Sequence, residues 1–153
     1  MFGFKPGESS GSDVDSGIYT KEASKITFDH LLNLSSMILE SGLSVIVDAT
    51  FLKRKDREDF EKQAREKGIR YNIIDCQISA NQAKNRIKGR AKAGTDASEA
   101  TVSVLETQLD DIDPLTLEEQ GFALVFDMTR SLETQLARAN SLLQETGATN
   151  AQH

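Results

Sequence analysis

The sequence is poor in residues that crosslink chains, stack on bases or span membranes. Its 153 residues include one cysteine, Cys76, two tyrosines and no tryptophan. A single thiol excludes an intrachain disulfide and, with no signal peptide, predicts a reducing, cytoplasmic location. No apolar run approaches the roughly 20 residues that cross a bilayer, which argues against a membrane protein. The few large aromatic side chains leave no stacking platform for single-stranded nucleic acid.

The charge balance is acidic. The formal net charge is −6 and the sequence pI is about 5.0. Broad attraction to nucleic acid or to anionic membranes needs a basic face, so this balance argues against both partners, although a local basic pocket stays open. Hydrophobic residues make up 38% of the chain, which is ordinary for a globular domain with a real core.

Periodicity predicts alternating helices and strands. Short β-branched runs bounded by glycine or aspartate predict buried strands, and apolar residues at helical spacing predict amphipathic helices. Cys76 would be a buried structural thiol at a strand end. Alternation of this kind is typical of an α/β fold with a parallel sheet covered by helices on both faces. We expect helices at 20–41, 54–67, 81–93, 96–111 and 130–144, one further turn at 115–120, and strands at 44–48, 71–76 and 122–126.

The ends of the chain differ from this pattern. Glycine, serine, proline and aspartate dominate the first residues without any period, which predicts a flexible loop over 1–19. Residues 20–146 form the predicted domain, and residues 147–153 form a tail that should fray.

The segment SVIVDATFLKRKDR places four polar side chains at the end of a predicted strand. Asp48 ends the strand, Thr50 follows, and Arg54 and Arg57 begin the next helix. Open α/β sheets bind ligands at this edge, where a carboxylate could orient Mg²⁺ and arginines could bind phosphate with two parallel hydrogen bonds. The alternative is that Asp48 caps a turn and the arginines lie on a solvated helix surface. Spacing alone leaves both interpretations open.

A second basic segment begins at residue 85. Arg86 and Arg90 lie one helical turn apart, and Gly94 breaks the helix after them. Asp96 and Glu99 then form a capping box that would open the next helix. An arginine pair before a glycine hinge fits a lid that closes over phosphates. A plain solvated basic face is the alternative.

Several motifs occur in one order along the chain: VDAT-FLKRKDR, a charged helix, a strand ending in DC, R-x-x-x-R-x-x-x-G-x-DASEA, VLETQLDDIDPLTLEE, and a last strand ending in Asp. In this order they resemble the P-loop kinase and AAA-type ATPase family. That lineage includes polynucleotide-kinase-like, zeta-toxin-like and gluconate-kinase-like proteins. The sequence also resembles the ATP-binding half of bacterial bifunctional aminoglycoside phosphotransferase/ATP-binding proteins. The likeness extends from roughly Phe2 to Leu142.

The resemblance implies a three-layer α/β/α domain that binds ATP and Mg²⁺ and passes a phosphoryl group to an unknown hydroxyl-bearing acceptor. It makes Asp48 the catalytic, Mg²⁺-side carboxylate and puts Thr50 and Arg57 on the phosphate or substrate side. Arg86 and Arg90 would be catalytic lid arginines. Asp127 and Thr129 would close the last strand near the nucleotide base.

The sequence also lacks the phosphate-binding loop that the resemblance leads one to expect. Proteins of this family begin with a strand, a GxxxxGK[ST] loop and a helix, followed by a strand that leads to an acidic residue. The glycine-rich stretch Gly3–Ser12 does not match that loop, because Lys5 precedes Pro6 and Gly7. We expect that the chain begins inside the domain, without roughly the first 30 to 40 residues of a βαβ unit. ATP binding should then be weak or absent, and the chain inactive alone.

The missing strand has a structural consequence. In the family it lies between the strands that match residues 44–48 and 71–76, so its loss would leave two unpaired edges and marginal stability. An alternative function follows from this: a non-catalytic or split module that another protein segment completes through the exposed sheet edge.

Overall fold

The computed structural model describes residues 21–93 and 101–148, and their contacts divide them into two compact units. The first unit comprises residues 21–71, 84–93 and 101–114, and the second comprises 72–83 and 115–148. The predicted loop over 1–19 and the last residues of the predicted tail lie outside the described part. None of the described helices is long and apolar enough to cross a membrane.

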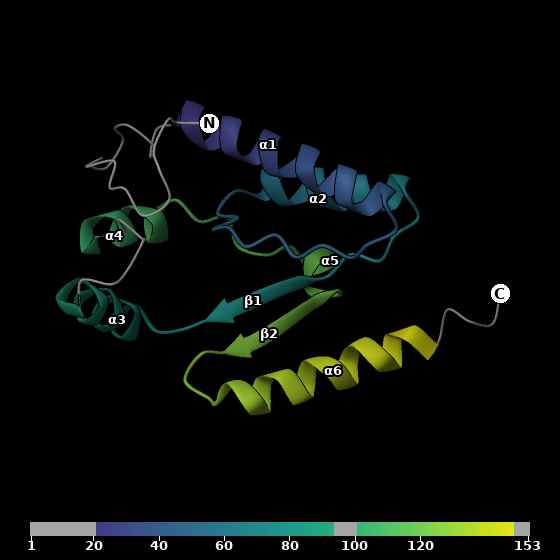
Figure 1. Ribbon diagram of the computed structural model, residues 1–153. Coiled ribbons are helices and arrows are strands. Elements are labelled where there is room, and N and C mark those ends of the chain that lie inside the picture. The colour runs from purple at the N-terminus through teal and green to yellow at the C-terminus, as the bar shows by residue number, and fades with distance from the viewer. Residues whose placement is uncertain (1–20, 94–100, 149–153) are drawn as a thin grey trace. The chain divides into compact units, whose positions relative to one another are not determined.

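The elements follow the predicted order with one exception, which concerns a strand (Figure 1). An α/β fold with a small parallel sheet is therefore observed, while the three-layer arrangement stays a prediction. The described elements are α1 (Lys21–Glu40), α2 (Arg54–Glu66), β1 (Ile73–Gln77), α3 (Ala80–Ala93), α4 (Val102–Asp110), α5 (Leu117–Gln120), β2 (Ala123–Asp127) and α6 (Leu132–Ala148).

Helix α1 is followed by a glycine that turns the chain. Gly42 has φ +80°, a left-handed conformation that costs glycine little. The amide of Gly42 donates to the carbonyl of Leu39 at 3.0 Å, and the amide of Leu43 donates to that of Ile38 at 3.4 Å. These two bonds form a Schellman motif, which satisfies carbonyls at the helix end and turns the chain sharply.

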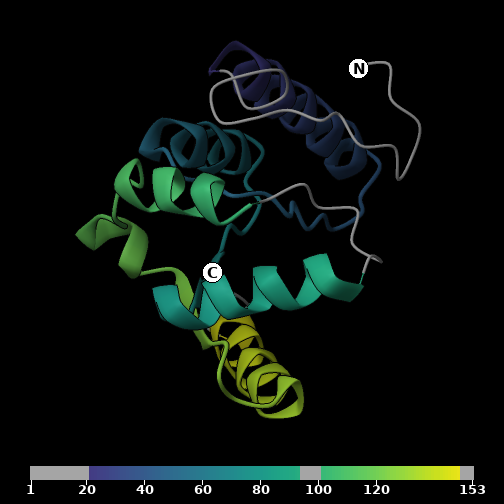
Figure 2. The ribbon, with the colours of Figure 1, turned by 90° about the vertical axis from the view of Figure 1, so that its left-hand side faces the viewer.

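Helices α1 and α2 lie side by side in the first unit, and a polar contact joins them (Figure 2). Ser35 is buried and donates from its hydroxyl to Oε1 of Gln63 at 2.8 Å. Nε2 of Gln63 donates in turn to the carbonyl of Leu32 at 2.9 Å. Phe60 and Ala64 are buried on α2 at the predicted spacing of four residues. Buried apolar side chains on α2 and the hydrogen bonds of Ser35 and Gln63 therefore both contribute to the packing of the two helices.

The predicted strand over 44–48 is the exception, and the prediction was wrong. Residues 43–48 form neither helix nor strand, and no ladder pairs them with another segment of the described chain. A strand exists only where backbone groups find a partner, and β-branched residues supply the tendency but not the partner. The predicted three-stranded sheet is thus a two-stranded sheet among the described residues.

Phe51 ends this segment in a strained conformation. Its φ is +44°, which is uncommon for a residue with a large side chain. The ring packs edge-to-face on Phe28 of α1 and on Phe60 of α2, with both pairs of centroids 5.2 Å apart. Aromatic pairs of this geometry contribute about 0.5–1.5 kcal/mol each beyond area burial, enough to offset the strain.

The second unit contains the sheet. Strands β1 and β2 are parallel, as the alternation of helices and strands predicted, and Ile73 lies opposite Ala123 and Gln77 opposite Asp127. Helix α6 packs against β2 and buries Gln135 and Ala139 on the facing side. Cys76 is exposed, so the prediction of a buried thiol was wrong. A strand with only one paired neighbour leaves its side chains less covered than a central strand would.

Phe51 provides a test of the strain. Replacement by alanine and replacement by glycine remove the same ring. Only alanine is destabilised in the left-handed conformation, by about 1 kcal/mol, because it has a Cβ atom. We expect Phe51→Gly to be more stable to urea than Phe51→Ala, the reverse of the usual order, with both below the original chain. If the alanine variant proves the more stable one, the left-handed conformation is not a constraint at this position.

Candidate functional site

The segment over 43–50 carries two of the predicted site residues. Asp48 and Thr50 are exposed, and neither side chain makes a hydrogen bond or ion pair within the part of the chain that the structure describes. The alternative in which Asp48 caps a turn is therefore not observed. A carboxylate that the protein leaves unpaired is available to a cation or to a donor on a ligand.

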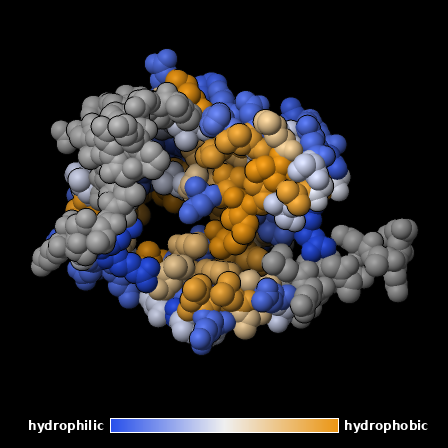
Figure 3. Space-filling view, viewed as in Figure 1, coloured by the Kyte–Doolittle hydropathy of each residue, from blue (hydrophilic) through white to orange (hydrophobic). Residues whose placement is uncertain are grey.

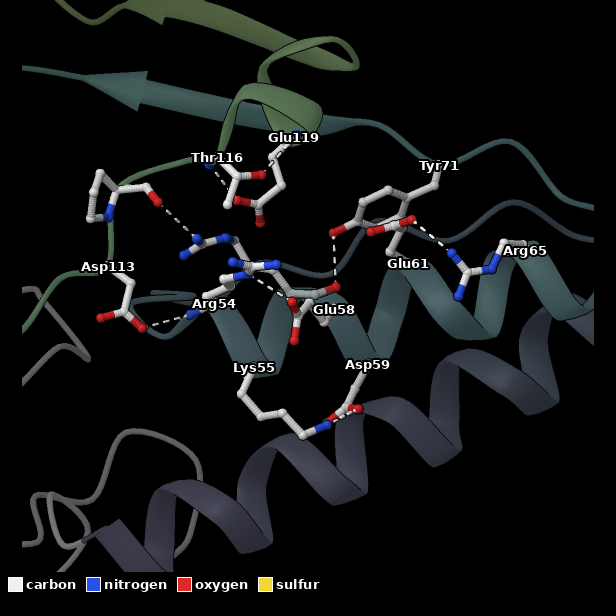
Figure 4. Close-up of polar contacts among 12 residues, drawn as sticks. Arg54, Lys55, Glu58, Asp59, Glu61, Arg65, Tyr71, Asp113, Thr116 and Glu119 are labelled. Atoms are coloured by element: carbon white, nitrogen blue, oxygen red, sulfur yellow. Dashed lines mark hydrogen bonds and ion pairs between the residues drawn. The ribbon is translucent and has the colours of Figure 1, made fainter.

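The N-terminus of α2 is held by aspartates from a distant loop. Oδ2 of Asp113 accepts a hydrogen bond from the amide of Arg54 at 3.0 Å, where a negative charge offsets the helix dipole. Nζ of Lys53 donates to Oδ1 of Asp111 at 2.6 Å, and this bond raises the pKa of Lys53. The Arg54 guanidinium pairs with Glu58 at 2.7 Å (Figure 4). Arg54 thus lies on a charged helix surface, as the alternative interpretation had it.

Arg57 has contacts with the protein itself. Its side chain is buried at 4% exposure. Nη1 donates to the carbonyl of Phe51 at 3.0 Å, and Nη2 donates to the carbonyl of Pro114 at 3.3 Å. The guanidinium therefore ties the end of this segment to the loop after α4. Its predicted role as a phosphate ligand stays a prediction, and phosphate would have to replace these bonds.

The predicted lid arginines lie on α3. Arg86 and Arg90 are exposed, one turn apart, as their spacing predicted. Nearby, Nζ of Lys84 pairs with Glu106 of α4 at 2.6 Å. The proposed hinge at Gly94 and the capping box of Asp96 and Glu99 lie outside the described residues.

The start predicted for the helix after the hinge was wrong. Helix α4 begins at Val102, and Thr101 is its N-cap, whose hydroxyl accepts from the amide of Val104 at 3.3 Å. Thr101 thus caps an amide in the first turn of α4, the task that the sequence assigned to Asp96 at a helix start five residues earlier.

Asp127 and Thr129 come together at the end of β2 in the second unit. Oδ1 of Asp127 accepts from the amide of Thr129 at 3.0 Å and from its hydroxyl at 2.6 Å. These bonds lower the pKa of Asp127, with a smaller contribution from Arg130. The side-chain amide of Gln135 donates to the Asp127 carbonyl, which joins the turn to α6. A role near a nucleotide base stays a prediction for both residues.

The sequence did not predict the hydrogen bonds and ion pairs between residues 51–57 and the loop over 111–114. In the acidic run before Pro114, Asp111 binds Lys53 and Asp113 binds the start of α2. These partners lie 58 and 59 residues apart, so no local spacing signals them. Among residues 21–93 and 101–148, no group of three His, Cys, Asp or Glu side chains could hold a metal ion.

Comparison with known proteins identifies the family. A family model described as an AAA domain matches residues 5–115, well over half of the chain. The chain belongs to the AAA domain family. Comparison with curated proteins and with solved structures found no match.

Membership of the AAA domain family indicates a nucleotide-binding function of the kinase or ATPase kind. P-loop domains of this kind generally bind ATP and Mg²⁺. The matched residues include Asp48, Thr50, Arg54 and Arg57, as well as Arg86 and Arg90. Asp127 and Thr129 lie beyond the end of the match.

The buried guanidinium provides a test within this AAA domain. Arg57→Lys keeps the charge but cannot reach two carbonyls with a planar fork, so we expect a loss of about 1.5–3 kcal/mol in the free energy of unfolding. The matched control is Arg54→Lys, whose exposed ion pair contributes under about 1 kcal/mol. Urea unfolding of the two variants gives the comparison. Equal losses would show that the bonds to Phe51 and Pro114 stabilise nothing.

Proposed function

We propose that this chain is a P-loop kinase-like module that provides the Mg²⁺-side carboxylate and the lid arginines for phosphoryl transfer from ATP. The observation that carries the proposal is the unpaired, exposed carboxylate of Asp48 inside the residues that match the AAA domain family. Mg²⁺ bound to nucleotides is commonly held by one or two carboxylates together with phosphate oxygens and water. Asp48 fits that role because no side chain of the described protein neutralises it.

Arg86 and Arg90 support the same proposal from another element. Two exposed guanidinium groups one turn apart present planar donors on one face of α3. Phosphate oxygens accept from arginine in a bidentate geometry, and charge that develops during transfer is stabilised by such donors. The acceptor would carry a hydroxyl group, as in kinases generally.

We further propose that the chain does not carry out this chemistry alone. The 153 residues contain no GxxxxGK[ST] sequence, whose backbone amides and lysine supply much of the affinity for the β- and γ-phosphates. Binding of Mg·ATP by this chain should therefore be weak or absent.

A second candidate function is favoured by the segment over 43–50. It is a module whose partner is another protein chain, which adds a strand to this unpaired backbone. In this candidate the exposed Asp48 is a surface carboxylate, and Mg·ATP plays no part.

One experiment separates the two candidates. The chain is mixed with a separate strand–GxxxxGK[ST]–helix segment, and phosphate release from Mg·ATP is measured. Under the leading proposal, release appears only in the mixture and falls by about 10²-fold or more with Asp48→Ala, because a charge-stabilising group is lost. Asp110→Ala removes another exposed carboxylate of the first unit and should change nothing.

The outcomes are distinct. Tight association of the two segments without phosphate release favours the second candidate. Release by the chain alone, or release that survives Asp48→Ala, contradicts the leading proposal.

A further inference from the structure

The segment over 43–50 follows α1 and has no backbone partner among the described residues after Leu43. The amide of Leu43 makes the last hydrogen bond of the helix end, and the next carbonyl that accepts one is that of Phe51. Backbone groups from residue 44 to residue 50 make no hydrogen bond within the described chain. Buried or interfacial backbone groups are nearly always paired, so an open row of them is a template for a strand.

Both ends of this segment are fixed. Gly42 turns the chain out of α1 through the Schellman motif. Phe51 anchors the other end by its ring between Phe28 and Phe60 and by the bond from Arg57 to its carbonyl. A segment held at both ends loses little conformational entropy when a second strand binds.

Side chains alternate along the segment as they do in a strand. Val45, Val47 and Ala49 are half-buried, whereas Ile46 between them is 85% exposed. Leu43 is 64% exposed. Figure 3 shows apolar surface open to the viewer beneath α1, where Figure 1 draws the chain that follows this helix. Natural edge strands are protected by lysine, proline or bulges, and residues 43–50 contain neither lysine nor proline.

We propose that this segment pairs with the same segment of a second copy of the chain, antiparallel about a two-fold axis at Ile46. In that register Ile46 faces Ile46 of the other copy, Val45 faces Val47, and Asp48 faces Ser44. Every residue from 43 to 49 then lies opposite a residue of the other copy, every second one hydrogen-bonds across the pair, and the exposed side chain of Ile46 is covered. This inference deepens the second candidate function by naming its partner, and it rests on that candidate.

Charge selects the antiparallel arrangement. Asp48 is the only charged residue between Gly42 and Phe51. In a parallel, in-register pair the two Asp48 carboxylates would be direct neighbours, and like charges at that position are destabilising. In the antiparallel pair each carboxylate lies across from the hydroxyl of Ser44, which can donate a hydrogen bond to it.

Cysteine crosslinking tests the register, with Cys76→Ser removing the native thiol. Directly opposite residues of an antiparallel pair are close enough for a disulfide. Ile46→Cys should therefore crosslink rapidly under mild oxidation into a dimer. Thr50→Cys is the matched control: it is also exposed, but it lies opposite Gly42, far from its own copy, and should crosslink slowly.

Sedimentation of the full chain tests whether the segment over 43–50 forms the dimer interface. We expect a dimer that Ile46→Lys converts to a monomer with an unchanged far-UV circular dichroism spectrum, because the substituted side chain is exposed. Met37→Lys, at a side chain of α1 that is 66% exposed, should leave the dimer intact. A dimer that survives Ile46→Lys, or equal crosslinking at positions 46 and 50, overturns the inference.

A chain that is monomeric at every concentration also overturns it. If that monomer still binds a strand supplied on a separate segment, the second candidate function stands without self-pairing. If it binds none, both fail, and the leading proposal is judged by phosphate release alone.

Discussion

The buried guanidinium of Arg57 is the constraint on which the first unit depends. It holds the carbonyl of Phe51 and the carbonyl of Pro114, two points far apart in the sequence. With the Phe51 ring packed between two helices, this bond fixes where the segment over 43–50 ends and where α2 begins. The aspartates at 111 and 113 add to the same junction from the loop before Pro114. An arginine expected to bind ligand phosphate thus organises the backbone beside the candidate carboxylate.

The junction explains how Asp48 stays exposed and unpaired. The segment that bears it is held by its two anchored ends, and backbone hydrogen bonds of its own contribute nothing to its conformation. Family membership points to nucleotide binding, and we propose the Asp48 carboxylate for it, while the open backbone points to a second strand. The two proposals use different atoms of the same segment: the carboxylate oxygens for Mg²⁺, and the main-chain amides and carbonyls for a partner.

Local signals in the sequence predicted most of the elements. Glycines at 42 and 68 marked helix ends because both adopt positive φ, and apolar spacing located α2 and α6. The parallel pairing of the strands near 73 and 123 followed from the alternation of helices and strands. The prediction of a strand at 44–48 was wrong because β-branched residues favour a strand but do not supply the neighbouring strand that it must pair with. Contacts such as Arg57 to Pro114 were beyond sequence reasoning, since they join residues 57 positions apart.

The candidate site was predicted in part. The position of Arg86 and Arg90 one turn apart on one helix follows from their spacing, whereas Asp127 and Thr129 were named only through the family resemblance, which did not predict the hydrogen bonds between them. The burial of Arg57 could not be predicted from the sequence, because nothing in its local sequence distinguishes it from the exposed Arg54 one turn earlier.

Amide hydrogen exchange of residues 44–50 at several protein concentrations tests the account most directly. In dilute protein these amides should exchange freely while those in the middle of α1 and α2 are protected, because the single chain gives the segment no partner. As the concentration rises, protection should then appear at every second amide of this segment, because alternate residues of an antiparallel pair hydrogen-bond across it. Amides that are protected at every dilution would contradict the claim that the backbone of this segment is unpaired in the single chain. Amides that exchange freely at every concentration would contradict the pairing of this segment with a second copy.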